Sequence, residues 1–499
     1  MLKLLAFDYG ASSGRAILGK FDGEKLALDE VHRFSNDPVM IRGRLYWDIL
    51  RLFHEMKQAI LKCVKNGDKD IAGIGTDTWG VDFGLIGANG ELLGNPFHYR
   101  DSRTEGMIEK ACETVPKRDI YNRTGIAFQK FNTLYQLLSM KLNNSPMLGK
   151  ASSLLFTPDL LNYFLTGEKA TEFTIASTSQ MLEAGGRGWA VSMLEKLGIP
   201  CNILLDIIDP GTVIGRVDER ICEELNTERA PVIAVAGHDT GSAVISVPAE
   251  GERYAYLSSG TWSLLGVELN EPVINDSTYS MNYTNEGGYG RTTRLLKNIM
   301  GLWIYQECKR TWDKQGEVHS FDELEDMAMK AGHSGSFIDP DDDLFYSPGH
   351  MPEKIAEYCR NTGQPVPDGK AQIVRCVMES LALKYRMALD GLEDILGYAI
   401  PALHIVGGGS RNTMLNGFTA GAIGKPVVAG PVEATAAGNL ACQLLALGEI
   451  SGIKEARQLM RRSFPARVYE PCDKGKWDEA YGKFKEIINK AGSKNKIDG

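Results

Sequence analysis

Two hydrophobic stretches near the start of the chain, residues 2–7 and 16–18, flank the polar, glycine-rich segment DYGASSGR at 8–15. Short apolar runs around such a segment predict a β-hairpin. Glycine allows positive φ and close approach, and successive backbone N–H groups in a turn can form an anion-binding nest. The turn therefore suggests a phosphate cradle. The alternative is an ordinary hairpin with a polar turn, because short glycine motifs are weak evidence.

The same pattern returns in the second half of the chain, where YAYLSSGTWSLLG occupies residues 254–266. An apolar run is again followed by a small serine and glycine turn and by a second apolar run. The repetition predicts a duplicated fold in which each half contributes one turn to the phosphates of a nucleotide.

Helical periodicity appears in several segments, where apolar residues recur at a spacing of three or four. It predicts amphipathic helices over residues 48–65, 370–396 and 477–489. Residues 295–306 carry few charges and are also predicted to be helical, with Asn298 and Gln306 able to face a cleft. Residues 335–368 hold clusters of proline, glycine and aspartate, which predict an irregular excursion.

Polar residues follow two predicted strands. TDTWGVDF at 76–83 combines carboxylates, hydroxyls, an aromatic ring and a glycine, a set suited to holding a sugar. The alternative is a strand pair with a buried tryptophan. GHDTGSA at 237–243 follows an apolar strand, and ligands of α/β proteins bind at the carboxyl ends of strands. Asp239 could therefore act as a base, or it could simply cap a helix.

Three further features favour a nucleotide. Asp8 ends the first predicted strand, and its carboxylate suits a hydrated Mg²⁺ because hard cations prefer oxygen ligands. Arg15 could meet phosphate oxygens as a fork. HIVGGGSRN at 404–412 places three glycines between a strand and a helix, where a purine or phosphate could lie against the backbone. A tight turn is the alternative for these glycines.

Composition narrows the class of protein. The 499 residues suffice for two or three domains, and 43% hydrophobic with 24% charged residues is typical of a globular protein. A net charge of −9 argues against nucleic acid or an anionic membrane as a partner. Neither a membrane-length apolar run nor a signal-peptide pattern is present, so we expect a cytoplasmic protein. Nine scattered cysteines predict free thiols, although one or two disulfides remain open.

Taken together, these motifs resemble the FGGY family of carbohydrate kinases over essentially the whole chain. The supporting segments are DYGASSGR, TDTWGVDF, GHDTGSA with LSSGTWS, NEGG at 285–288, LKNIMGLW at 296–303, and HIVGGGSRN with GPVEAT. The resemblance implies an α/β fold with two ribonuclease-H-like domains of the actin-like ATPase type around a central nucleotide and sugar cleft. It implies an N-terminal sugar-kinase domain over residues 1–247, a C-terminal nucleotide domain over 248–455, and a C-terminal helical segment over 456–499 that packs back on the domains.

The resemblance also implies a role for each matching residue. The implied ATP contacts are Ala11, Ser12, Ser13, Gly14, Arg15, Thr261, Gln306 and Gly408. The implied sugar contacts are Gly80, His238, Asp239, Thr240 and Asn298, with Asp239 as catalytic base. ATP and Mg²⁺ are the expected cofactors, with the metal held through water by Asp8.

The implied activity is transfer of the γ-phosphate of MgATP to the 1-hydroxyl of L-rhamnulose, in L-rhamnose catabolism. TDTWGVDF and LKNIMGLW are more particular to family members that act on this sugar. L-fuculose or L-xylulose, an actin-like or Hsp70-like nucleotide switch, and an inactive sugar-binding regulator remain alternatives. The expected partners are a small-molecule sugar and ATP, without nucleic acid or membrane, for a monomer or homodimer.

Overall fold

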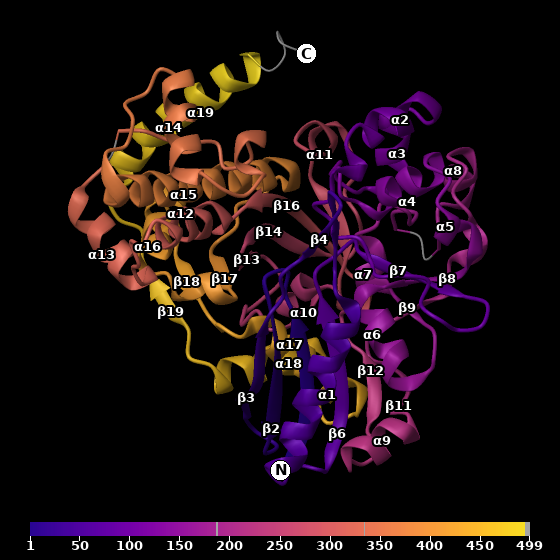
Figure 1. Cartoon of the computed structure of the whole chain (residues 1–499). Coiled ribbons are helices and arrows are strands. Elements are labelled where there is room, and N and C mark those ends of the chain that lie inside the picture. The colour runs from indigo at the N-terminus through magenta and orange to yellow at the C-terminus, as the bar shows by residue number, and fades with distance from the viewer. Residues whose placement is uncertain (186–187, 334, 495–499) are drawn as a thin grey trace. The chain divides into compact units, whose positions relative to one another are not determined.

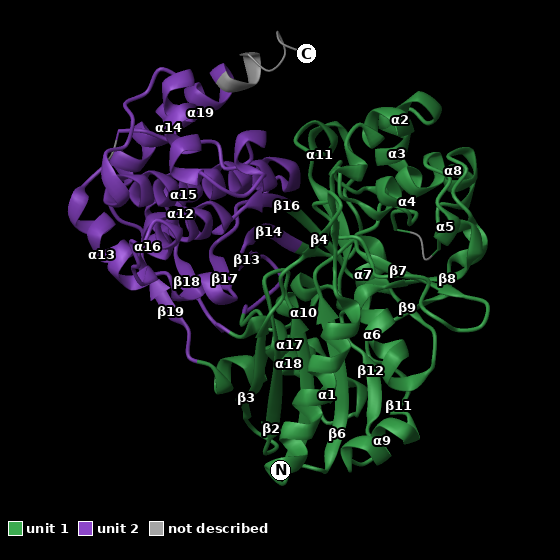
Figure 2. Ribbon diagram, viewed as in Figure 1, with its two compact units in different colours: residues 1–248, 268–296, 433–464 green, residues 249–267, 297–432, 465–499 purple. Residues whose placement is uncertain are grey.

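The computed structural model describes residues 1–185, 188–333 and 335–494, so residues 495–499 of the predicted C-terminal segment lie outside it. The chain forms two compact units that alternate along the sequence (Figure 2). Unit 1 contains residues 1–248, 268–296 and 433–464, and unit 2 contains residues 249–267, 297–432 and 465–499. The chain therefore leaves unit 1 and returns to it twice.

The main sheet of unit 1 has the strand order β11-β12-β6-β1-β2-β3 (Figure 1). The predicted first hairpin is confirmed, because β1 and β2 pair in antiparallel fashion with Asp8 opposite Arg15. β6 joins β1 in parallel, and β12 joins β6 in parallel. The strands are β1 (Leu2–Tyr9), β2 (Ser13–Phe21), β3 (Leu26–Ser35), β6 (Ile71–Thr78), β11 (Thr212–Arg216) and β12 (Pro231–Ala234).

The second large sheet has the order β15-β16-β14-β13-β17-β18-β19. Here too an antiparallel hairpin, β13 with β14, is followed by two strands in parallel, β17 beside β13 and β18 beside β17. The strands are β13 (Ala255–Ser259), β14 (Trp262–Leu269), β15 (Thr284–Gly287), β16 (Thr293–Met300), β17 (Leu403–Val406), β18 (Val427–Ala429) and β19 (Arg467–Tyr469). The shared connectivity confirms the predicted α/β class with two ribonuclease-H-like, actin-type domains.

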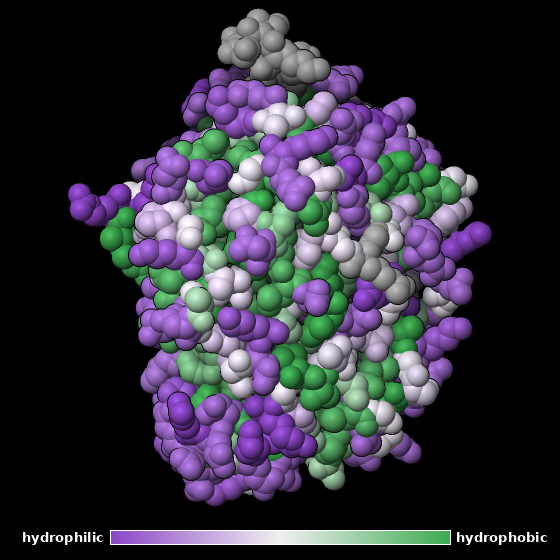
Figure 3. All heavy atoms as spheres, turned by 90° about the vertical axis from the view of Figure 1, so that its right-hand side faces the viewer, coloured by the Kyte–Doolittle hydropathy of each residue, from purple (hydrophilic) through white to green (hydrophobic). Residues whose placement is uncertain are grey.

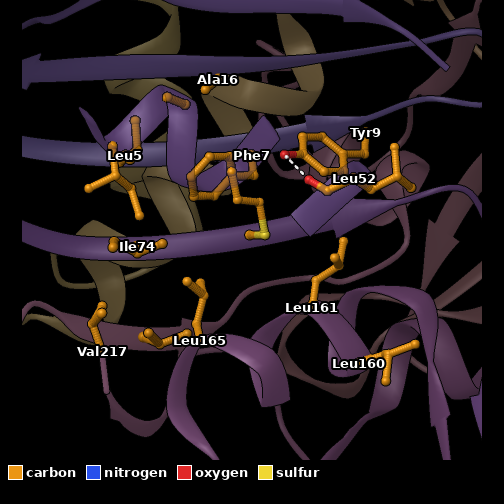
Figure 4. Packing of buried hydrophobic residues seen from close by; sticks show 14 of the residues in the cluster. Leu5, Phe7, Tyr9, Ala16, Leu52, Ile74, Leu160, Leu161, Leu165 and Val217 are labelled. Carbon is orange, nitrogen blue, oxygen red and sulfur yellow. Dashed lines mark hydrogen bonds between the residues drawn. The ribbon is translucent and has the colours of Figure 1, made fainter. Parts of the chain in front are cut away.

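Strand β1 is buried on both faces. Leu5, Phe7 and Tyr9 point into a cluster with Ile74 and with residues of α1 and α6 (Figure 4). Leu4 and Ala6 point the other way and pack against α17. Successive side chains of a strand alternate between faces, so helices must cover both sides of such a strand.

Helices and short strand pairs complete the units. The helices of unit 1 are α1 (Ile49–Lys65), α2 (Met107–Thr114), α3 (Lys117–Thr124), α4 (Thr133–Leu142), α5 (Pro146–Lys150), α6 (Thr157–Thr166), α7 (Phe173–Ser177), α8 (Val191–Lys196), α9 (Glu219–Leu225), α10 (Asp239–Ile245), α11 (Asp276–Ser280), α17 (Ala434–Ala446) and α18 (Ile453–Ser463). Those of unit 2 are α12 (Trp303–Lys314), α13 (Phe321–Ala331), α14 (Met351–Asn361), α15 (Gly369–Leu396), α16 (Thr413–Ile423) and α19 (Lys474–Lys494). The short strand pairs are β4 (Val39–Ile41) with β5 (Arg44–Tyr46), β7 (Phe83–Gly87) with β8 (Ala151–Phe156), and β9 (Thr171–Glu172) with β10 (Ile207–Ile208).

The predicted helices α1, α15 and α19 are confirmed, and two local predictions are wrong. Residues 295–300 belong to strand β16, and the helix α12 begins only at Trp303. Periodicity cannot separate a short apolar strand from a helix, and pairing with β15 decides the matter here. The segment 335–368 contains the helix α14, whose Pro352 lies in the first turn, where proline is tolerated.

All nine cysteines are free in the structure, as the sequence pattern predicted.

Within the described residues, we find no helix with the length and apolar character needed to cross a bilayer. On the face drawn in Figure 3, hydrophilic residues are intermixed with hydrophobic ones, and the latter show mostly across its middle.

The contact between α10 and α17 leaves no room for a side chain at Gly438. A Cβ atom there would lie 1.8 Å from the backbone oxygen of Ser242. We expect Gly438→Ala to force the helices apart and to lower the free energy of unfolding by about 1–3 kcal/mol, as overpacking usually does. Urea unfolding followed by circular dichroism measures this. Gly149→Ala in α5 is the matched control, because its new Cβ would meet no atom within 4 Å. An equal effect of both variants would contradict the packing role.

Candidate functional site

Two hydrogen bonds from Asn36 hold the turn of the first hairpin. The side-chain amide of Asn36 donates to the Gly10 carbonyl at 2.9 Å, and its backbone N–H donates to Ser12 O at 3.1 Å. Gly14 leaves room for the ring of Phe34, since a Cβ there would lie 2.2 Å from that ring and would require it to move. Ser12 and Ser13 are exposed at the tip. The turn is thus fixed in shape while its serines remain accessible, as a phosphate cradle requires.

Arg15 lies between two carboxylates of unit 1. Its Nη2 and Nε atoms are each 2.9 Å from Oδ2 of Asp8, and its Nη1 atom is 2.5 Å from Oε2 of Glu433. Glu433 is the N-cap residue of α17, so this arginine ties the hairpin to the start of that helix. The predicted phosphate contact of Arg15 stays a prediction, and it would have to compete with these ion pairs.

Asp77 lies beside Asp8 because the parallel register of β1 and β6 pairs the two residues. Its side chain is fully buried, and Oδ2 accepts a hydrogen bond from the Asn439 amide at 2.6 Å. Among the described residues, Oδ1 has no hydrogen-bond partner. Burial raises the pKa of Asp77 well above its usual value, the nearby charge of Asp8 raises it further, and the bond from Asn439 opposes both effects.

Asp82 anchors the segment that the sequence suggested for sugar recognition. Its Oδ2 accepts from Trp47 Nε1 at 2.6 Å, Trp79 Nε1 at 2.9 Å and Tyr99 N at 3.1 Å. Gln136 donates to its Oδ1 at 2.8 Å. Burial raises the pKa of Asp82 to about 6, although these bonds oppose the shift. Asp77 and Asp82 are thus both buried and held by protein donors, whereas Gly80 between them is partly exposed.

Asp239 is the first residue of α10 and follows His238, the N-cap. The backbone here is fixed because Gly237 N donates to Glu172 Oε2 at 2.9 Å and Thr78 N donates to Gly237 O at 2.9 Å. The Asp239 side chain is 31% exposed. Burial raises its pKa and Asp8 adds to the shift, whereas His238 opposes it. A carboxylate with a raised pKa at the end of a strand is suited to general-base catalysis.

Unit 2 brings two predicted nucleotide residues together, since Thr261 Oγ1 donates to Gln306 Oε1 at 3.4 Å. The glycine segment lies beside the end of β13, where a Cβ at Gly409 would lie 1.9 Å from Ser259 Oγ. Gly408 is exposed in this segment, and a Cβ there would meet no atom within 4 Å. Asn298 is partly exposed on β16 rather than on a helix.

A divalent cation fits unit 1 only with water as part of its shell. No group of three or more histidine, cysteine, aspartate or glutamate side chains in the described ranges could enclose a metal directly. The Asp8 carboxylate and the unbonded Oδ1 of Asp77 offer hard oxygen ligands. Mg²⁺ usually keeps several waters and takes one or two carboxylates, so this donor set is compatible with it.

Comparison with known proteins identifies the family of this chain. The N-terminal and C-terminal domain models of the FGGY family of carbohydrate kinases match residues 3–246 and 255–447. The rhamnulokinase of Bacteroides thetaiotaomicron is 46% identical over 97% of this chain and 99% of its own length. The rhamnulokinases of Oceanobacillus iheyensis and Bacillus subtilis are 43% and 40% identical, covering 93% and 94% of this chain and 97% and 95% of their own.

Solved structures agree on the fold. The xylulose kinase of Lactobacillus acidophilus superposes with a TM-score of 0.82 at 18% identity, covering 99% of both chains. The glycerol kinase of Plasmodium falciparum with ADP gives a TM-score of 0.77 at 18% identity, covering 99% of this chain and 98% of its own. At such identities the likeness speaks for the fold alone.

The buried Asp77 should make folding stability depend on pH. Its pKa is higher in the folded than in the unfolded chain, so stability falls as pH rises above about 3.9, the unfolded value. We expect Asp77→Asn to be more stable than the wild type at pH 7, with a difference that shrinks toward pH 4. Urea unfolding between pH 4 and 8 measures this. Asp29→Asn, at an exposed carboxylate paired with Lys20, should show little change. A less stable Asp77→Asn at pH 7 would contradict the explanation.

Proposed function

We propose that this chain, which belongs to the FGGY family of carbohydrate kinases, transfers the γ-phosphate of ATP to the 1-hydroxyl of L-rhamnulose, giving L-rhamnulose 1-phosphate and ADP. The choice of sugar is supported by relatives named rhamnulokinase, 39–46% identical over 93–98% of this chain. The single structural observation that carries the chemistry is Asp239, a partly exposed carboxylate fixed at the start of α10.

In this proposal Asp239 accepts the proton of the sugar hydroxyl. The O–H bond breaks as the oxygen attacks the γ-phosphorus, the bond from that phosphorus to the bridging oxygen breaks, and its electron pair stays on ADP. Phosphoryl transfer asks a protein mainly for positioning and charge stabilisation. Gly80, His238, Thr240 and Asn298 would position the ketose beside this carboxylate.

ATP would be held by backbone and side-chain groups of both hairpin turns, from Ala11 to Arg15 and at Thr261. Gln306 would help to hold the nucleotide, and Gly408 would line the adenine side. Asp8 would hold Mg²⁺ through water. When bound, this ion would neutralise charge on the phosphate oxygens.

The experiment that tests the substrate is a coupled assay of ADP release with L-rhamnulose, L-fuculose and L-xylulose. We expect kcat/KM to be highest with L-rhamnulose by at least about tenfold, since a site built for particular hydroxyls rejects sugars that misplace them. EDTA should abolish ADP release. If another ketose gave the highest kcat/KM, that ketose would be the substrate in place of L-rhamnulose. ATP hydrolysis at a rate that no sugar changes would overturn the proposal.

Removing the base should separate binding from chemistry. We expect Asp239→Asn to lower kcat by about 10²–10⁴-fold, the usual contribution of a general base, while it still binds L-rhamnulose. Single-turnover kinetics and calorimetric titration measure the two quantities. Near-normal turnover would remove Asp239 from the mechanism.

A further inference from the structure

Unit 1 contains a buried ion pair that the proposed reaction does not use. Glu286 and Arg294 are directly opposite in the β15–β16 register, and their side chains are 6% and 0% exposed. Arg294 Nη2 lies 3.2 Å from Glu286 Oε2, and Arg294 Nε donates to Gly287 O at 2.8 Å. Taking two charges out of water is costly, and a buried pair is weak evidence for stability. A role for the pair should therefore be sought in what it touches.

The pair contacts the ring of His238 at one nitrogen. Nδ1 of His238 is 3.1 Å from Arg294 Nη2 and 3.2 Å from Glu286 Oε2. The other ring nitrogen, Nε2, is 3.4 Å from Oδ1 of Asp239. His238 is only 6% exposed, so these three side chains define the polar surroundings of its ring.

These neighbours favour particular protonation states of the ring. Arginine only donates, so a bond from Arg294 to Nδ1 needs the lone pair there and leaves the proton on Nε2. If Nδ1–H instead donates to Glu286, two states of the ring are possible. In the imidazolium, Nε2 is also protonated. In the neutral ring, Nε2 has a lone pair that faces the Asp239 carboxylate, and this arrangement is repulsive. Both favourable states therefore place a proton on Nε2, toward Asp239.

Asp239 is anchored through one oxygen. Thr240 N donates to Oδ1 at 2.5 Å, Thr240 Oγ1 donates to it at 3.1 Å, and His238 Nε2 faces the same atom. In the described part of the chain, these polar contacts of the Asp239 side chain all fall on Oδ1. Oδ2 is the oxygen that they leave for another partner.

We propose that Glu286 and Arg294 are positioning residues, which hold a protonated Nε2 of His238 against Oδ1 of Asp239 and so reserve Oδ2 for the hydroxyl proton of the sugar. This inference rests on the proposed function, because it assigns the reacting oxygen of that same base. Glu286 and Arg294 act through His238 and do not themselves meet the substrate.

The test is the pH profile of kcat/KM for L-rhamnulose in Glu286→Gln, whose side chain keeps its shape but loses its charge. The charged groups that act on Asp239 are His238, Asp8 and Asp77, and those at the His238 ring are Glu286, Arg294 and Asp239. With Glu286 neutralised, the ring loses one of its two charged partners at Nδ1 and is held less firmly against Oδ1, so His238 lowers the pKa of Asp239 less. We expect the acidic limb to move to higher pH, with kcat/KM about tenfold lower at pH 6, a smaller loss at pH 8, and KM for ATP within about twofold.

Two comparisons distinguish a positioning role of Glu286 from a general loss of structure. Glu268→Gln is the matched control, since Glu268 also pairs with a largely buried arginine, Arg457, at 2.5 Å but has no contact with His238 among those described. Its profile should match the wild type. In a His238→Asn background, Glu286→Gln should change kcat/KM by less than about twofold, because the route through the ring is gone. The inference would be overturned if the acidic limb of the pH profile did not shift in Glu286→Gln. It would also be overturned if Glu286→Gln lowered kcat/KM by the same factor in the His238→Asn background as in the wild type.

A direct measurement covers the case in which Glu286→Gln does not fold. In wild-type protein with ¹⁵N-labelled histidine, the His238 signals are assigned by their loss in His238→Asn. We expect either an Nε2–H or an imidazolium ring, and a neutral ring protonated on Nδ1 would overturn the inference. This spectrum does not depend on turnover, so an inactive wild type would count against the proposed function while leaving the assignment of the ring testable.

Discussion

Buried negative charge is the constraint on which this structure depends. The parallel pairing of β1 with β6 places Asp8 beside Asp77, and Asp8 also acts on the charge of Asp239. Carboxylates removed from water need either a proton or a compensating partner. Each of the three receives a different partner, namely Arg15 for Asp8, Asn439 for Asp77 and His238 for Asp239. The three aspartates therefore lie in three different environments, although they are the same residue type.

The compensating groups come from distant parts of the sequence. Asn439 and Glu433 lie at α17, and Glu286 and Arg294 lie on β15 and β16, in the two segments by which the chain returns to unit 1. The same helix that supplies Asn439 also covers the apolar face of β1 formed by Leu4 and Ala6. Packing and charge compensation are therefore coupled, because Gly75 of β6, where a Cβ would lie 2.6 Å from Asn439 Oδ1, permits the close approach that brings the Asn439 amide to Asp77.

The two hairpins are alike in connectivity but differ in how their turns are supported. In the first, Gly14 accommodates the ring of Phe34, and Asn36 holds the turn. In the second, Gly409 accommodates Ser259, and the backbone of Gly301 and Leu302 donates to Thr261 and Gly260. The two sheets thus have the same strand connectivity, while the turn of each hairpin is stabilised by different contacts.

The sequence by itself determined the strands around both glycine turns, the long helices and the family, because alternation, helical periodicity and motif spacing are local properties of the chain. It indicated Asp8 and Asp239 as chemically important, because Asp8 ends an apolar strand and Asp239 comes shortly after another. The strand at residues 295–300 and the helix over 351–361 followed instead from pairing and packing. Tertiary structure alone decided that Asp77 and Asp82 are buried, that Arg15 lies between two carboxylates, and that Glu286 and Arg294 meet His238. Such contacts depend on strand register and on segments that are far apart in the chain, and neither is encoded in the spacing of residues along it.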